Sequence, residues 1–143
     1  MSDARDAIAA IIFTYAERID AGDLAGVAAL FAEATFRSTQ GGAYHGSAAV
    51  LEVLTRLVIL HPDGTPRTKH VTTNLVIEVD DAAGSATARS YFTVLQATER
   101  VPLQPIVAGR YLDRFVRDAA VWRFDDRLIS MDLLGDLSDH LRS

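Results

Sequence analysis

The spacing of apolar residues predicts helices in the first half of the chain. Ile8, Tyr15 and Ile19 fall on one helical stripe, and Gly22 after them suits a left-handed helix end. Asp23 is placed to cap a second short helix. A brief extended piece over 35–39 follows. A third helix is expected to begin at Ser47 as its N-cap and to end at His61-Pro62, because proline disfavours helix before it.

The second half of the chain is predicted to form β-strands. Segments 66–80, 85–99, 107–117 and 121–133 are rich in strand-forming residues, and short turns join most of them. Such an order predicts an antiparallel meander. Helices that precede strands predict an α+β fold, with three N-terminal helices packed on a strongly curved, mainly antiparallel sheet. Three short helices cannot fill the concave face, so we expect a pocket there, within one domain over 1–143.

Composition narrows the classes of function. The chain has 143 residues, of which 49% are hydrophobic and 23% charged, a balance typical of a globular domain. It contains no cysteine, which excludes a disulfide, a thiolate nucleophile and cysteine-ligated zinc. The net charge of −5, without a basic stripe, argues against nucleic acid as a partner.

The N-terminal region gives no sign of a membrane segment. Its apolar stretch, 7–13, is far shorter than the ~20 residues that a membrane span needs. It also lacks the basic start and cleavage pattern of a signal peptide. We therefore expect a cytoplasmic protein that does not enter membranes.

Asp20 is the first candidate for chemistry. On a helical projection it lies beside Phe13 and Ala16 at the edge of the apolar stripe. A carboxylate that leans toward a core is costly unless it is paired or solvated in a cavity. The structural alternative is a carboxylate that bonds nearby backbone or an arginine.

His70 is the second candidate. Strand alternation places His70, Thr72 and Asn74 on one face of segment 66–80. Histidine titrates near neutral pH and suits proton transfer, and an aspartate partner would fix its tautomer. The alternative is a structural histidine on a solvent-facing strand.

The other histidines are weaker candidates. His45 lies in a glycine-flanked loop, His61 at a helix end and His140 in the terminal tail. They stand at no metal-ligand spacing, so we predict no metal. Phosphate-binding glycine loops and a GxSxG elbow are also missing from the sequence, so we expect no nucleotide cofactor and no serine hydrolysis.

The last predicted hairpin carries arginines that can serve a site. An inward-pointing Arg110 or Arg127 would hold a carboxylate or a developing oxyanion, and strand parity does not choose between them. Tyr91 is either a hydrogen-bond donor to a ligand or a core aromatic. With Asn74, Arg127 and Tyr91 form our predicted substrate-binding set.

Several weak motifs agree in order and spacing across nearly the whole chain. They are Ala16-(x)3-Asp20-Ala21-Gly22-Asp23, Tyr44-His45-Gly46, His70-(x)3-Asn74, Gly109-Arg110-Tyr111-(x)-Asp113 and Trp122-Arg123. This pattern resembles the SnoaL-like branch of the nuclear-transport-factor-2-like superfamily. The resemblance implies a cone-like fold and a homodimer formed through the sheet. It does not settle function, since this fold hosts dehydratases, isomerases, cyclases, hydrolases and non-catalytic binders.

Within that superfamily, the chain looks most like the scytalone-dehydratase-like and bile-acid-dehydratase-like lyases. Tyr15 and Asp20 match their helix pair, His70 their sheet histidine and Arg127 an arginine on the last strand. The resemblance implies a cofactor-independent lyase for a small, partly apolar, oxygenated substrate, with Tyr15, Asp20 and His70 as catalytic residues. The alternatives are an isomerase or cyclase with the same pair, and a non-catalytic small-molecule-binding or accessory protein.

Overall fold

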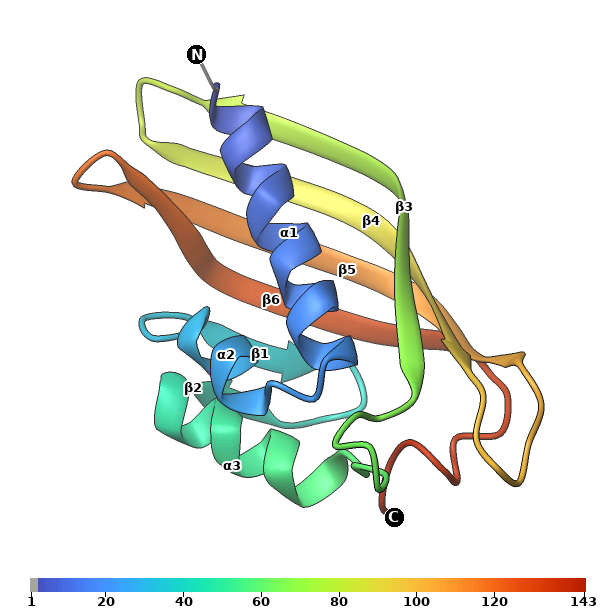
Figure 1. Cartoon of the computed structure of the whole chain (residues 1–143). Coiled ribbons are helices and arrows are strands. Elements are labelled where there is room, and N and C mark those ends of the chain that lie inside the picture. The colour runs from blue at the N-terminus through green and yellow to red at the C-terminus, as the bar shows by residue number, and fades with distance from the viewer. Residues whose placement is uncertain (1–2) are drawn as a thin grey trace.

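A computed structural model describes residues 3–143, which form three helices and six strands (Figure 1). The helices are α1 (Ala4–Asp20), α2 (Leu24–Ala29) and α3 (Ser47–Leu57). The strands are β1 (Thr35–Ser38), β2 (Ala43–His45), β3 (Thr68–Asp80), β4 (Ser85–Gln96), β5 (Gln104–Asp118) and β6 (Val121–Leu134).

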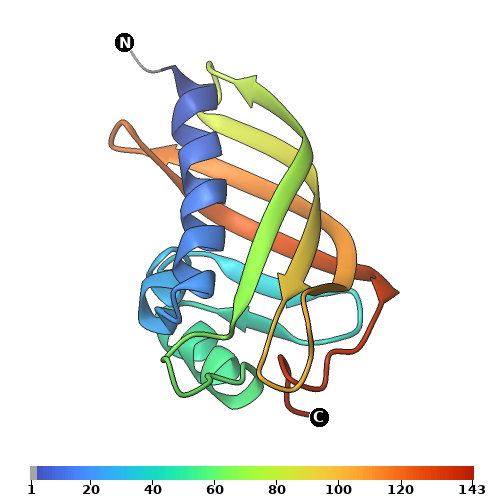
Figure 2. The same cartoon turned by 45° about the vertical axis from the view of Figure 1, so that its right-hand side comes forward.

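The six strands make one curved sheet in the order β2-β1-β6-β5-β4-β3. Neighbouring strands are antiparallel except β1 and β6, which are parallel. The sheet curls around α1, and α2 and α3 close one end of it (Figures 1 and 2). The predicted α+β architecture is confirmed, and the cone-like shape follows from this curl.

Local signals set the helix ends. Asp23 caps α2 as predicted, because its Oδ1 accepts a hydrogen bond from the Gly26 amide at 2.9 Å. Gly22 has a φ of +77°, and a Cβ there would lie 2.0 Å from the Gly64 carbonyl oxygen. Only glycine therefore fits this turn.

The expected bounds of α3 are corrected. Its N-cap is Gly46 rather than Ser47, and no side-chain hydrogen bond caps it. The helix ends at Leu57, well before Pro62, because Val58 takes an extended conformation and forms a β-bridge with Leu141. A contact with the C-terminal tail, distant in sequence, therefore ends the helix.

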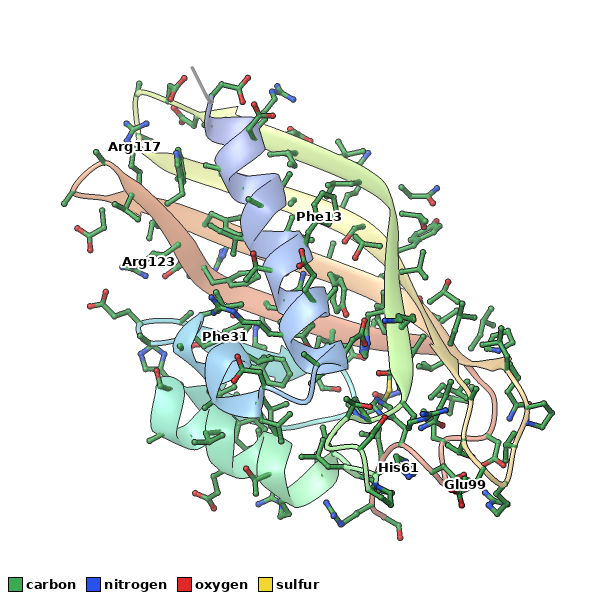
Figure 3. The ribbon with its side chains drawn as sticks, in the orientation of Figure 1. Phe13, Phe31, His61, Glu99, Arg117 and Arg123 are labelled. Carbon is green, nitrogen blue, oxygen red and sulfur yellow. The ribbon has the colours of Figure 1, made fainter. Side chains whose placement is uncertain are left out.

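The core lies between α1 and the concave face of the sheet. Phe31, labelled in Figure 3, stacks on Phe124 of β6 at 4.8 Å between ring centroids, and Phe115 also stacks on Phe124 at 4.8 Å. Tyr15 on α1 meets Tyr111 on β5 edge-on at 5.9 Å. These aromatic contacts fix α1, and with it Asp20, against the sheet.

A β-bulge at Asn74 divides β3 into two halves. The register with β4 shifts between Thr73 and Val76, and Asn74 takes a φ of +53°. His70 and Thr72 are half-buried before the bulge, whereas Asn74 is exposed. The prediction that Asn74 shares the face of His70 is therefore wrong, because strict alternation does not continue through a bulge.

Candidate functional site

The structure brings Asp20 and His70 into direct contact. Asp20 Oδ1 lies 2.6 Å from His70 Nδ1, and Asp20 Oδ2 accepts a hydrogen bond from the His70 amide at 2.8 Å. The Thr68 hydroxyl donates to Oδ1 at 2.9 Å. The last residue of α1 is thus tied to the start of β3 by three hydrogen bonds, which hold the carboxylate in one orientation.

This geometry keeps the carboxylate ionised and orients the imidazole. Burial opposes ionisation, but the hydrogen bonds from His70 and Thr68 and the charge of His70 leave the Asp20 pKa below its usual value. Because Nδ1 is engaged, Nε2 is the His70 nitrogen available to a ligand. The side chains are 9% (His70) and 11% (Asp20) exposed, so the pair is shielded yet not sealed.

Arg127 and Tyr15 belong to a second buried cluster. Arg127 is fully buried, and its Nε and Nη2 donate to Asp113 at 2.8 and 3.0 Å. Its guanidinium carbon lies 4.3 Å from the Tyr15 ring centroid and 3.6 Å from that of Tyr111. Of the two arginines between which strand parity did not choose, Arg127 is therefore the one that points inward. Arg110 instead pairs with Asp132 at 2.8 Å among exposed groups.

Burial and ion pairing determine the protonation states of the groups in this cluster. Burial raises the pKa of Tyr15 despite the nearby positive charge of Arg127, so its hydroxyl keeps its proton at neutral pH. Burial also raises the pKa of Asp113, which Arg127 opposes. Arg127 Nη1 is buried without a hydrogen-bond partner in the described part of the chain. A protonated phenol beside a fixed cation suits stabilisation of a developing oxyanion.

Tyr91 and Asn74 do not join this interior. Tyr91 is 52% exposed, between the buried Ser90 and Phe92, and so faces the outer side of the sheet. Together Asn74 and Tyr91 line a shallow depression of about 460 Å³ with Arg110 on that outer side. The structure thus separates these two predicted binding residues from His70.

His140, a weaker candidate in the sequence, lies beside His70 in the structure. Its ring centroid lies 6.0 Å from that of His70, and the two planes meet at 66°. The residue is 6% exposed, and its Nδ1 is buried without a partner among residues 3–143. The only sequence signal is that Leu137 and Leu141 flank it in a tail that packs on the core.

Two cavities share Asp63 and Arg67 in their lining, and one of them reaches Asp20. One of about 370 Å³ reaches Asp20 at the β3 edge, where Thr68, Leu95 and Leu103 also line it. The predicted pocket within the concave face stays a prediction.

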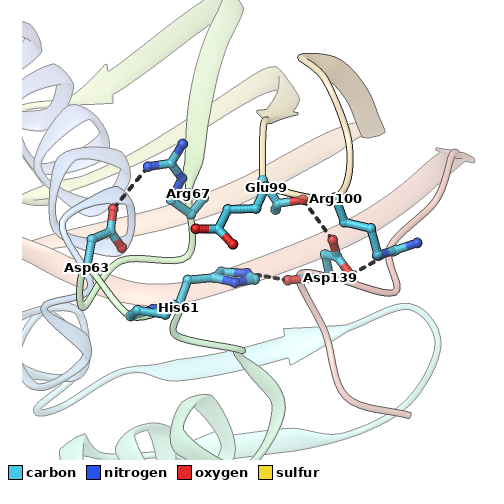
Figure 4. Close-up of a pocket in the computed structure, with 8 residues that line it drawn as sticks. His61, Asp63, Arg67, Glu99, Arg100 and Asp139 are labelled. Atoms are coloured by element: carbon cyan, nitrogen blue, oxygen red, sulfur yellow. Dashed lines mark hydrogen bonds and ion pairs between the residues drawn. The ribbon is translucent and has the colours of Figure 1, made fainter.

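The second cavity, of about 560 Å³, lies between loops at the same end of the molecule (Figure 4). It is lined by His61, Asp63, Arg67, Glu99, Arg100 and Asp139, with Pro62 and Thr98. Its arginines are already paired, Arg100 with Asp139 at 2.7 Å and Arg67 with Asp63 at 3.4 Å. No group of three acidic or histidine side chains among residues 3–143 is placed to hold a metal ion.

The sequence model of the SnoaL-like domain family matches residues 1–127. The chain belongs to this family, and its fold is that of the nuclear-transport-factor-2-like proteins. A search of the curated proteins finds no match. None of the helices in residues 3–143 is long and apolar enough to cross a membrane.

Solved structures share the fold. Rv3472 from Mycobacterium tuberculosis, described as a function unknown protein, is 29% identical with a TM-score of 0.74, over 91% of this chain and 72% of that one. A putative scytalone dehydratase from Novosphingobium aromaticivorans is 23% identical with a TM-score of 0.72, over 92% and 86%. ActVI-ORFA from Streptomyces coelicolor is 22% identical with a TM-score of 0.72, over 90% and 96%.

Proposed function

We propose that this protein is a cofactor-independent lyase of the dehydratase type, with Asp20 and His70 as its acid–base pair. The observation that carries the proposal is the 2.6 Å contact between Asp20 Oδ1 and His70 Nδ1. Such a contact fixes the imidazole tautomer and stabilises the imidazolium that forms when the ring accepts a proton. A fold neighbour named as a putative scytalone dehydratase supports the reaction class.

The elimination begins at Nε2 of His70. This nitrogen removes a proton from the carbon next to a substrate carbonyl, and the electron pair of the broken C–H bond moves toward the carbonyl oxygen as an enolate. Collapse of the enolate forms the C=C bond and breaks the C–O bond of the β-hydroxyl. The departing oxygen takes the proton from His70 and leaves as water, so no co-reactant is consumed. Such general acid–base transfer is worth about 10²–10⁴-fold.

Tyr15 and Arg127 would stabilise the enolate. The Tyr15 hydroxyl stays protonated and can donate a hydrogen bond to the oxyanion. Arg127, whose guanidinium carbon lies 4.3 Å from the Tyr15 ring centroid, supplies positive charge in a buried setting where it is weakly screened. The surrounding aromatic rings favour a small substrate that is partly apolar.

The test compares His70→Gln and Asp20→Asn with the wild type against a panel of small β-hydroxycarbonyl compounds. We expect the wild type to release a product lighter by one water, detected by mass spectrometry. His70→Gln should abolish turnover, and Asp20→Asn should reduce it by about 100-fold or more. His45→Gln, on the distant β2 strand, is the matched control and should remain active.

Other outcomes would overturn the lyase. A product of unchanged mass that depends on His70 identifies an isomerase or cyclase. Binding without turnover identifies a non-catalytic binding protein. Turnover that survives His70→Gln in a folded variant would remove the pair from the mechanism, with circular dichroism as the check of folding.

A further inference from the structure

The C-terminal tail delivers a second imidazole to the candidate site. His140 lies 70 positions after His70 in the chain, yet their ring centroids are 6.0 Å apart. No hydrogen bond between the two rings is found in the described structure. The contact is therefore not a local consequence of strand or helix geometry, and the tail itself must hold the ring there.

The tail is anchored on both sides of His140. The Ile59 amide donates to the His140 carbonyl at 2.8 Å, and Leu141 forms a β-bridge with Val58. One residue earlier, the Asp139 carbonyl oxygen lies 2.8 Å from His61 Nε2 and accepts from Gln96 Nε2 at 3.1 Å. These bonds fix the backbone, so the His140 ring is held in place rather than left on a free end.

The His140 ring is polar at a position where an apolar ring would give a more stable fold. Its side chain is buried, with apolar neighbours on the tail at Leu137 and Leu141, and its Nδ1 has no partner. A buried nitrogen without a partner costs stability, and phenylalanine would fill similar space without that cost. A side chain that costs stability beside an acid–base pair is typical of a functional role.

The ring is also uncharged, and the burial of one nitrogen allows its tautomer to be assigned. Burial and the charges of His70 and His61 lower the His140 pKa to about 4, which the negative charge of Asp20 partly opposes. A neutral imidazole carries one proton, and a buried N–H without a partner is rarer in proteins than a buried acceptor without one. The proton therefore sits on Nε2, since only Nδ1 is enclosed without a partner.

We propose that His140 is a further catalytic residue, whose Nε2–H donates a hydrogen bond to an oxygen of the substrate held at His70. The inference rests on the proposed lyase function. Because His140 stays neutral, it does not compete with His70 for the proton that is transferred. A β-hydroxycarbonyl substrate offers two oxygens near the reacting carbons, of which Tyr15 would hold the carbonyl oxygen and His140 the hydroxyl.

The test uses the full chain and a catechol, whose phenolate oxygen mimics the enolate and whose neighbouring hydroxyl offers the second oxygen. We would add 4-nitrocatechol to protein labelled with ¹⁵N in its histidine rings and follow the ring nitrogens by NMR. We expect the signals of both His70 and His140 to move on binding, with His140 in its Nε2–H form. His140→Phe should weaken binding about tenfold while its melting temperature stays equal to or above that of the wild type. His140→Gln should restore part of the affinity through its amide donor.

The outcomes separate this proposal from the lyase proposal. If the catechol moves only the His70 signals and binds His140→Phe as tightly as the wild type, His140 has no contact with the ligand and the inference is wrong, while the Asp20–His70 pair stands. If the catechol moves neither histidine, both proposals fall. The matched control is His45→Phe, which removes an imidazole from exposed β2 and should leave binding unchanged.

Discussion

At the scale of single residues, His140 should make the protein sensitive to mild acid. The unfolded chain takes up a proton at this histidine near pH 6.5, whereas the folded chain does so only at about pH 4. Between these values the unfolded state binds more protons, so the free energy of unfolding falls as the pH falls. The full loss is about 3 kcal/mol at most, and it is complete below pH 4.

Urea unfolding across this pH range measures the effect. His140→Phe should be at least as stable as the wild type at neutral pH and should lose less stability in acid, because phenylalanine binds no proton. Parallel pH profiles of the two proteins would contradict the assignment. Carboxylates such as Asp20, whose pKa is lowered by folding, weaken the fold only nearer their own lower pKa, so the two windows are distinguishable.

Asp20, His70 and His140 show which parts of the candidate site can be predicted from the sequence. Asp20 and His70 each follow from a local period, since a helical projection turns one toward the core and strand alternation places the other on a face. Their meeting in space is a contact of the folded chain that neither period predicts. His140 follows from no period, because its position depends on contacts of the tail with Ile59 and Val58, more than 80 positions away.

At the scale of elements, the bulge in β3 decides which side chains face α1. Before it, Thr68, His70 and Thr72 point inward, and after it Leu75 and Ile77 do so. One extra residue in the strand thus lets its polar half and its apolar half both face the concave side. Asn74 suits this position because it tolerates a positive φ better than most residues.

The effect of a substitution at Asn74 on stability should therefore depend on how well the new residue adopts a positive φ, and not on the chemistry of its side chain. Asn74→Val should lower the free energy of unfolding by about 1–3 kcal/mol, since a β-branched residue is strained at positive φ. Asn74→Gly should be close to neutral, and thermal unfolding of both variants gives the comparison. A valine variant as stable as the glycine variant would show that the bulge does not need this conformation.

The element bounds that were wrong share a cause with the bulge. Helix α3 was expected to continue to Pro62, because proline is a strong local stop. It ends at Leu57 because Val58 is used in a bridge to Leu141. A local rule gives the latest point at which a helix can end, and a tertiary contact can end it sooner.

At the scale of the whole molecule, the outer face of the sheet carries a row of side chains across four strands. The row is formed by register partners on neighbouring strands: Val76 of β3 pairs with Arg89 of β4, Arg89 with Leu112 of β5, and Leu112 with Leu128 of β6. Val76 is 39% and Leu112 48% exposed, with Tyr91 nearby at 52%. Apolar side chains gathered on one open face suit an interface between copies, so we propose a homodimer formed through this face.

The mutation Leu112→Asp tests this arrangement at the centre of the row. The side chain points away from the core, so the folded monomer should keep its melting temperature. A carboxylate at this position must lose water when the face is covered, even with Arg89 on the neighbouring strand, and should raise the dimer dissociation constant by about 100-fold. Sedimentation velocity at micromolar concentration should then show a dimer for the wild type and a monomer for the variant. Leu103→Asp, which changes a 69% exposed leucine in the β4–β5 loop, should remain dimeric. A monomeric wild type would contradict the dimer, and a dimeric Leu112→Asp would place its interface elsewhere.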